Sequence, residues 1–473
     1  MENISSTPWT RRAFALSALV LLATYAIFYV AQEKPPFRAT ATSTKPISND
    51  TTVYNSFSGI AGSRPATPSS SINGNTFMAA RRCQLKGERL ARPFGIGRNL
   101  LLPTIDDDTG PPYWCTQDTY DKSCRTSQHM LCPPKGLLFV KTPKTGSTTI
   151  SRIVKRIVSN VAQRYKNVGH DSTEVACQHR EDHINGAGLW YGNRVHNQSF
   201  LVASLRNPAE RAMSRFFWSY VTRHSPNGTE VPVDDAFVVD YLNKSTSVAN
   251  GCTSKGQGGY QLNYIAMESI KEWSAWHPLH PTQVIQPKAI EQLVHRTLQE
   301  YDFVILNERM EESLVLLQLL LGLEVGDIVG MAYNVGGSYR YEHGKCKQLI
   351  KSHASIGMQH YFRSDEWMAK NYGDYVLFAA VNRSIDLTIE KVVGRDRFDA
   401  ALKDFQQLEA TVNDVCSKRV PFPCSANGTV LSHTDHPVPH EKIARCIDKV
   451  VRENQQLRTK QNSFGIGEGN WHP

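Results

Sequence analysis

Apolar residues form short runs and helical stripes through the middle of the chain, and this pattern predicts alternating strands and helices. Residues 137–140 form an apolar run typical of a buried parallel strand, and from Ile150 the apolar residues recur with helical spacing. A second apolar run covers 200–205, and 301–321 has the pattern of a strand followed by a strongly apolar helix. The expected fold class is therefore α/β, with a central parallel sheet flanked by helices in one domain that spans residues 96–455.

The segments outside this domain have a different pattern. Residues 13–31 form an uncharged, mostly apolar run that is long enough to cross a bilayer as a helix. We expect an uncleaved signal anchor behind a cytosolic tail, 1–12. A cleaved signal peptide is the alternative, but the nearest candidate cleavage site, 39–41, lies far beyond the apolar run. Residues 32–95 are rich in Ser, Thr, Pro, Asn and Gly without apolar periodicity, which predicts a disordered stem, and 456–473 are expected to be a flexible tail.

Cysteines and glycosylation sequons indicate the compartment. All ten cysteines follow the apolar run, their number is even and no C-x-x-C pair occurs, so disulfides in an oxidising lumen are the favoured interpretation, with the pairing left open. The cysteines are Cys83, Cys115, Cys124, Cys132, Cys177, Cys252, Cys346, Cys416, Cys424 and Cys446. Sequons of the form N-x-[ST], which agree with a secretory route, occur at Asn49, Asn197, Asn227, Asn243, Asn382 and Asn427.

The charge balance favours an anionic ligand. The chain carries a formal net charge of +9 and has a pI near 8.9, which would also suit a protein that binds nucleic acid. The lysines and arginines are dispersed, however, and no nucleic-acid motif occurs, so we expect no nucleic-acid partner. No set of carboxylates, cysteines and histidines has the spacing of a metal site, and the sequence predicts no metal.

The loop between the first strand and its helix is the first candidate site. It reads Pro143-Lys-Thr-Gly-Ser-Thr148 and opens onto a helix N-terminus, where the backbone N–H groups from Gly146 to Thr149 and the helix dipole favour an anion. A nucleotide-triphosphate loop would carry its lysine directly after the last glycine, whereas Lys144 precedes Gly146. The pattern therefore disfavours an ATPase or GTPase.

A second candidate site follows the run at 200–205. Arg206 comes directly after this predicted strand, Pro208 opens the next helix, and Ser214 lies less than two turns into it. An arginine at the end of a strand can bind phosphate through charge-assisted hydrogen bonds. Since ligands of open α/β sheets bind at the carboxyl ends of the strands, the two candidate sites are expected at one edge.

These motifs resemble those of a known group of enzymes. The loop from Pro143 to Thr148 resembles the 5′-phosphosulfate loop of sulfotransferases that use 3′-phosphoadenosine-5′-phosphosulfate, and Arg206 with Ser214 resembles their 3′-phosphate site. Most of the stretch 135–416 is similar to the galactose 3-O-sulfotransferase family, including 301–321 and Gln178-His179-Arg180, and the two cofactor motifs are the most specific parts of the resemblance. One departure is Thr142-Pro143, which is closer to the uronyl 2-O-sulfotransferases.

The resemblance implies a role for each motif residue. Lys144 would reach the oxygen that bridges phosphate and sulfate, Gly146 would let the backbone approach the phosphate, and Arg206 with Ser214 would hold the 3′-phosphate. The remaining donor-binding residues would be Thr145, Ser147, Thr148 and Thr149. A sugar hydroxyl needs a base to remove its proton, and His179 is the first choice, followed by His183; Glu181 and Asp182 are the alternatives.

The expected protein is a single-pass type II membrane protein of the Golgi with a lumenal carbohydrate sulfotransferase domain. Its partners would be the membrane, through one N-terminal helix, and a glycan acceptor on lipid or protein, with the 3-hydroxyl of galactose as the expected position. A uronyl 2-O-sulfotransferase, a tyrosylprotein sulfotransferase and a noncatalytic lumenal glycan-binding protein are the alternatives.

Overall fold

The computed structural model describes a set of segments that all belong to the unit Ser70–Pro473. These segments are residues 74–95, 112–115, 133–167, 177, 179–183, 191–222, 234–245, 259–267, 287–331, 339–342, 345–420, 424–425, 427–430 and 440–463. The predicted cytosolic tail and signal anchor, 1–31, lie outside them. Among the helices of these segments, none is both long enough and apolar enough to cross a membrane.

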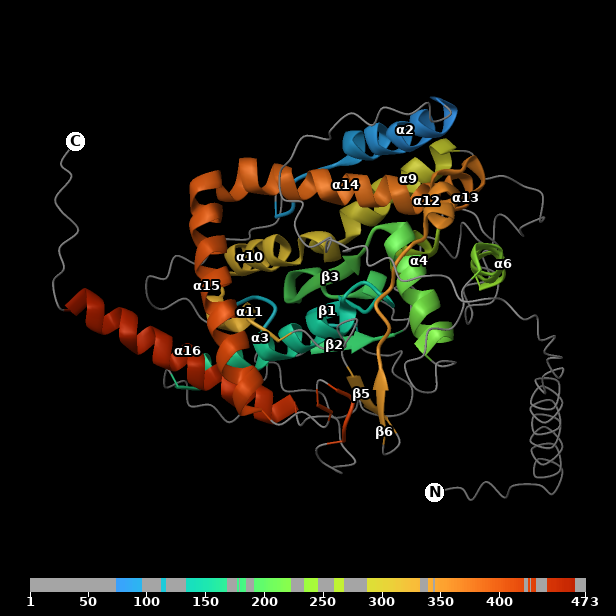
Figure 1. Cartoon of the computed structure of the whole chain (residues 1–473). Coiled ribbons are helices and arrows are strands. Elements are labelled where there is room, and N and C mark those ends of the chain that lie inside the picture. The colour runs from blue at the N-terminus through green and yellow to red at the C-terminus, as the bar shows by residue number, and fades with distance from the viewer. Residues whose placement is uncertain are drawn as a thin grey trace, which may run out of the picture. The chain divides into compact units, whose positions relative to one another are not determined.

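Four strands of the described segments form one parallel sheet in the order β2-β1-β3-β4. They are β1 (Gly136–Val140), β2 (His179–Asp182), β3 (Ser199–Leu205) and β4 (Phe303–Leu306). All residues of β1, β3 and β4 are buried, which explains why these strands are apolar throughout and do not alternate. Together with the flanking helices in Figure 1, the parallel sheet confirms the predicted α/β class.

The order of the strands defines where a ligand would bind. The chain runs outward from β1 to β2 on one side and from β3 to β4 on the other, while β1 and β3 are paired in the middle. The strand order therefore reverses between β1 and β3. In open α/β sheets this switch point opens a crevice beyond the carboxyl ends of the two strands.

Helices follow the strands as the apolar spacing predicted. After β1 comes α3 (Ser147–Asn167), and after β3 comes α4 (Pro208–Phe216), which continues as the π-helix η4 (Phe217–Val221). After β4, the 3-10 turn η5 (Asn307–Arg309) leads into α10 (Met310–Leu321). Each of these helices begins near the carboxyl edge of the sheet, so their N-termini gather there.

The other elements surround this centre (Figure 1). The helix α14 (Tyr372–Thr388) packs against β4 and α4. The remaining elements are η2 (Tyr191–Asn193), η3 (His196–Gln198), α6 (Asp235–Ser245), α7 (Tyr260–Ile265), α9 (Pro287–Glu300), α11 (Val325–Ile328), α12 (Ile356–Arg363), α13 (Asp365–Lys370), η6 (Ile389–Val393), α15 (Arg395–Arg419), α16 (His440–Ser463) and the antiparallel hairpin of β5 (Tyr339–Glu342) with β6 (Lys345–Gln348).

The folded domain begins earlier than the sequence predicted. Residues 74–95, assigned to the stem, contain helix α2 (Gly74–Leu90), which packs on α14. Cys83 and Phe94 are both buried in the hydrophobic core. The prediction is wrong for these residues because α2 buries only a narrow stripe and exposes polar side chains elsewhere, so its composition resembles that of a stem.

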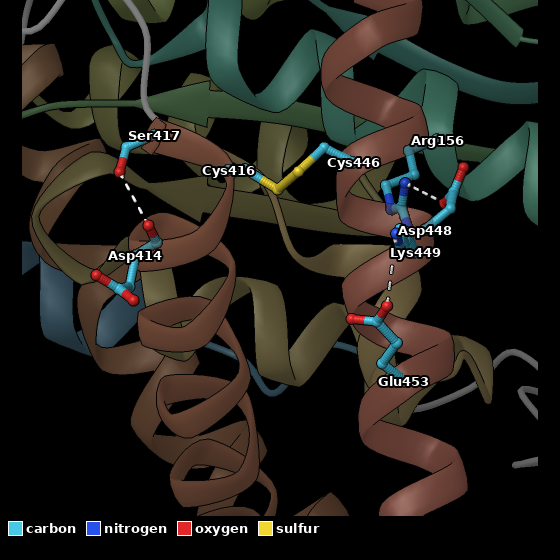
Figure 2. Close-up of a disulfide and its surroundings, with 8 residues drawn as sticks. All are labelled: Arg156, Asp414, Cys416, Ser417, Cys446, Asp448, Lys449 and Glu453. Atoms are coloured by element: carbon cyan, nitrogen blue, oxygen red, sulfur yellow. Dashed lines mark hydrogen bonds and ion pairs between the residues drawn. A yellow bond between two sulfur atoms is a disulfide. The ribbon is translucent and has the colours of Figure 1, made fainter. Parts of the chain in front are cut away.

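Disulfides link segments of the domain that lie far apart in the sequence. Figure 2 shows the bond between Cys416 on α15 and Cys446 on α16, beside the ion pair of Arg156 with Asp448 at 2.7 Å. The other described pairs are Cys115–Cys177 and Cys346–Cys424, so disulfides are confirmed for six cysteines.

Two further predictions about the ends of the domain differ from the structure. Cys83 is buried and forms no disulfide, and burial raises the pKa of its thiol to about 11. The helix α16 continues to Ser463, so 456–463 of the predicted flexible tail is helical.

Candidate functional site

The loop after β1 makes a sharp turn at the carboxyl edge of the sheet. The N–H group of Thr142 donates to the carbonyl of Val140 at 3.0 Å, and both Lys144 (φ 67°) and Gly146 (φ 74°) adopt positive φ angles. Positive φ is costly for lysine, so the surrounding contacts must hold this conformation. The turn directs the first N–H groups of α3 toward the switch point between β1 and β3.

Thr145 fastens this loop to the neighbouring strand. Its hydroxyl is buried, donates to the carbonyl of Thr142 at 2.8 Å and lies 2.6 Å from the hydroxyl of Ser204 on β3. The side chain of Thr145 is therefore used for holding the loop, although the sequence had predicted it among the donor-binding residues. Its contribution to a bound anion would have to come from its backbone.

Gly146 is packed where a side chain has no room. A Cβ atom there would lie 2.5 Å from Oδ1 of Asn307 and 2.7 Å from Cε of Met310, both beyond the end of β4. Next to it, Ser147 is buried and Thr148 is exposed. The N–H group of Thr149, a predicted donor-binding residue, is already bonded to the carbonyl of Gly146 at 3.0 Å.

The first N–H groups of α3 remain as hydrogen-bond donors that could bind an anion. Helix geometry leaves the N–H groups of Ser147 and Thr148 without an acceptor inside the helix. They lie at the positive end of the dipole of a helix that is 21 residues long.

Lys144 and Trp218 bring the two candidate sites into contact. The ammonium nitrogen of Lys144 lies 4.1 Å from the centre of the Trp218 ring, which comes from the π-helix after α4. Trp218 is only partly buried. A cation–π contact of this kind stabilises by about 0.5 to 2 kcal/mol. It therefore ties the loop after β1 to the segment after β3.

Arg206 follows β3 and has a well-held backbone. Its N–H group donates to Oε1 of Gln261 at 2.8 Å, and its carbonyl accepts from Nε2 of the same side chain at 2.7 Å. The guanidinium is about one fifth exposed and lies 3.3 Å from Glu210, while its Nε has no hydrogen-bond partner among the described residues. Ser214 lies further along α4 and is partly buried.

Glu308 supports the same turn from the end of β4. Its Oε1 accepts a hydrogen bond from the N–H group of Asn207 at 2.8 Å and lies 3.9 Å from Nε of Arg206. Burial raises the pKa of Glu308, and the Asn207 bond and the Arg206 charge oppose that rise. These contacts fasten the turn between β3 and α4 to the end of β4.

The two candidate bases lie at different ends of β2. His179 pairs with Leu137 at the start of β1, whereas His183 follows Asp182, the partner of the last residue of β1. At about 3.3 Å per residue, His179 lies roughly 10 Å behind the carboxyl edge. Nδ1 of His183 is 3.0 Å from the carbonyl of Lys141, so it carries the proton and Nε2 becomes the basic nitrogen.

The carboxylate next to His179 is already paired. Glu181 forms an ion pair with Lys155 at 2.9 Å. Burial raises its pKa, but hydrogen bonds from Ser151 and Lys155 outweigh burial and leave the pKa lowered. The pKa of His179 is lowered, chiefly by burial. The register of β2 against β1 therefore separates two histidines that the sequence alone could not place.

Some residues of the site were not found from the sequence. Gln261 lies beside Arg206 and Asn307 beside Gly146. Gln261 belongs to a segment without a recognisable motif, and Asn307 lies within 301–321 but nothing in that pattern singles it out. No group of three or more His, Cys, Asp or Glu side chains with the geometry of a metal site occurs within the described segments. No protein-family model, curated protein or solved structure matches this chain.

Proposed function

We propose that the chain is a carbohydrate sulfotransferase with a sulfotransferase-type α/β fold, and that it uses 3′-phosphoadenosine-5′-phosphosulfate as its donor. One observation carries the proposal. The two motifs that resemble phosphate sites lie at the switch point of the sheet, after the paired strands β1 and β3, and touch through Lys144 and Trp218. Such a crevice is where open α/β sheets bind nucleotides.

The residues at this edge fit a donor with two phosphate groups. The N–H groups of Ser147 and Thr148 would bind the 5′-phosphate, and the absence of a side chain at Gly146 keeps the loop packed against Asn307. Arg206, whose Nε makes no hydrogen bond among the described residues, would bind the 3′-phosphate together with Ser214. When bound, the donor supplies an activated sulfuryl group and a stable bisphosphate leaving group.

The chain would contribute a base and a positive charge. Nε2 of His183 would accept the proton of the acceptor hydroxyl, since the bond from Nδ1 to Lys141 fixes the tautomer. General-base catalysis typically contributes about 10² to 10⁴ in rate. The ammonium group of Lys144 would stabilise negative charge on the bridging oxygen, and such stabilisation is commonly the largest catalytic contribution. We place His183 ahead of His179 because of its position at the edge.

The acceptor and the compartment are part of the same proposal. We propose a glycan on lipid or protein as the acceptor, with the galactose 3-hydroxyl as the first candidate, on the resemblance described above. The apolar run at 13–31, the cysteines and the sequons support a Golgi membrane protein of type II with its domain in the lumen. The disulfides of the described residues agree with an oxidising compartment.

The test is sulfate transfer by the full-length chain produced in a eukaryotic host. Labelled donor is offered with β-galactosides, glycosaminoglycans and tyrosine peptides. Lys144→Ala and His183→Ala are each expected to lower the rate at least about 100-fold, because they remove the charge and the base. His179→Ala is the matched control, since it removes a histidine only four residues away, at the start of β2, and it should keep most of the activity.

The outcomes separate the alternatives. Transfer lost in His179→Ala and kept in His183→Ala would reverse the assignment of the base. Sulfate on uronic acid or on tyrosine would replace the galactose acceptor with one of the alternatives. A chain that transfers no sulfate and does not bind adenosine 3′,5′-bisphosphate would contradict the proposed function.

A further inference from the structure

Gln261 lies behind Arg206 and holds its peptide backbone from both sides. The side-chain amide accepts from the N–H group of Arg206 at 2.8 Å and donates to its carbonyl at 2.7 Å. Gln261 is only 1% exposed, so both hydrogen bonds are protected from water. Arg206 is the first residue after β3, where the hydrogen bonds of the strand end. The amide therefore takes the place of a neighbouring strand at this position.

Gln261 is itself held by a buried carboxylate on α14. Asp374 accepts from the backbone N–H groups of Gln261 at 3.0 Å and of Leu262 at 2.8 Å, and thereby caps the first turn of α7. Gly259 precedes this turn with φ 101°, and a Cβ atom there would lie 2.3 Å from Cγ of Asp374. This close approach and the two hydrogen bonds fix the start of α7 against α14.

A buried arginine completes the connection back to α4. The guanidinium of Arg211 lies 4.1 Å from the centre of the Tyr260 ring and interacts electrostatically with Asp374. Arg211 is 5% exposed and belongs to α4, the helix that begins two residues after Arg206. The contacts thus form a closed path from Arg206 through Gln261 and Asp374 to Arg211.

We propose that Gln261 is a positioning residue for the site of the nucleotide 3′-phosphate, and that it acts by fixing the backbone of Arg206. This inference rests on the proposed function. The two hydrogen bonds from Gln261, here called the clamp, fix the backbone from which the Arg206 side chain extends. Nε of that side chain has no hydrogen-bond partner among the described residues. Glu308 holds the next residue, Asn207, independently, so loss of the clamp should loosen Arg206 without releasing the whole turn.

The test compares two nucleotides that differ in one phosphate group. Equilibrium binding of adenosine 3′,5′-bisphosphate and of adenosine 5′-phosphate is measured with the full-length chain and its variants. Arg206→Ala should weaken the bisphosphate about 10- to 100-fold, because a charge-assisted hydrogen bond is lost. Gln261→Met, which keeps the volume and removes both hydrogen bonds, should weaken the bisphosphate about 3- to 30-fold and leave the monophosphate unchanged.

Two further variants show whether Gln261 acts through Arg206. In the Arg206→Ala background, Gln261→Met should cause no additional loss of bisphosphate affinity, as a double-mutant cycle requires of residues that act as a unit. Gln318→Met is the matched control, since it makes the same change on α10, and it should leave both affinities unchanged. If Gln261→Met does not fold, Gln261→Glu keeps the acceptor for the N–H group of Arg206 and is expected to show a smaller loss of the same selectivity.

The results that would overturn the inference differ from those that would overturn the function. A wild-type chain that binds neither nucleotide contradicts the proposed function and this inference with it. If Arg206→Ala weakens the bisphosphate while the Gln261 variants do not, the inference alone fails. It also fails if the Gln261 variants weaken both nucleotides equally, or if their effect adds fully to that of Arg206→Ala, because either result indicates general damage.

Discussion

At the scale of single residues, two separate features of the loop after β1 require a glycine at position 146. Gly146 has a positive φ angle, and its α-carbon faces Asn307 and Met310 at distances that exclude a methyl group. Gly394 also has a positive φ angle, at 87°, but a Cβ atom there would meet nothing within 4 Å. Comparing an alanine substitution at Gly146 with one at Gly394 therefore separates the cost of a positive φ angle from the cost of a clash with neighbouring atoms.

We predict that Gly146→Ala destabilises the protein more than Gly394→Ala does. The positive φ angle should cost about 1 to 2 kcal/mol in either variant. Gly146→Ala should cost about 1 to 3 kcal/mol more, since Asn307 and Met310 must move. Chemical denaturation measures both free energies of unfolding, and nucleotide binding should fall only in Gly146→Ala. Equal losses of stability in the two variants would mean that Asn307 and Met310 can move aside at little cost in free energy.

At the scale of elements, the contact of α10 with α15 contains two carboxylates. Burial raises the pKa of Glu409 on α15 to about 7, and the charge of Glu311 in the first turn of α10 adds to the rise. Gln406 donates to Glu311 at 2.7 Å from the same side of α15. The folded protein thus binds the proton of Glu409 more tightly than the unfolded chain does.

The direction of the pH dependence follows from this difference. A raised carboxyl pKa contributes stability that is fully present below the ordinary value of 4.5 and is lost as the pH rises through about 7. We predict that Glu409→Gln stabilises the fold by about 1 to 3 kcal/mol at pH 8 and has little effect at pH 4. Thermal unfolding at the two pH values measures it.

A control on the same helix tests whether the effect belongs to this contact. Asp414 is exposed on α15 and pairs with Lys418. Asp414→Asn should shift the unfolding temperature only slightly at either pH, because an exposed ion pair contributes little. If Glu409→Gln behaved in that way too, the carboxylate would titrate as it does in the unfolded chain, and the burial argument would be wrong.

At the scale of the whole domain, α2 supports the candidate site indirectly, through its packing on α14. It packs on α14, and α14 carries Asp374, which holds the start of α7 and thereby Gln261. The helices approach closely at Gly87, where a Cβ atom would lie 2.5 Å from the carbonyl of Val376 and 2.6 Å from Cβ of Ala379. The segment that resembles a stem is therefore part of the framework of the fold.

We predict that Gly87→Val lowers the free energy of unfolding of the domain by about 1 to 3 kcal/mol, because overpacking forces α2 away from α14. Leu85 is about half exposed on the same helix, and Leu85→Ser is the control, with an expected change within about 0.5 kcal/mol. Denaturant unfolding measures both. A Gly87→Val variant as stable as the wild type would show that α2 is not part of the cooperative unit.

Much of the candidate site could be predicted from local sequence. The strands β1, β3 and β4 are buried on both faces and so are apolar without interruption. The helix α3 comes directly after β1, and α4 directly after β3. The loop from Pro143 to Thr148 and the pair Arg206 and Ser214 needed only neighbouring residues to be recognised. These features depend on residues a few positions apart, which is the range over which periodicity and turn chemistry act.

The sequence by itself thus determined the α/β class, the two candidate phosphate sites and the expectation of disulfides in the domain. Only the tertiary structure decided that His183 lies at the carboxyl edge and His179 does not, that Gln261 holds Arg206, and that α2 belongs to the core. The physical reason is the range of the interactions. Strand register and helix packing depend on contacts between residues far apart in the chain, and no local pattern records which of those partners will meet.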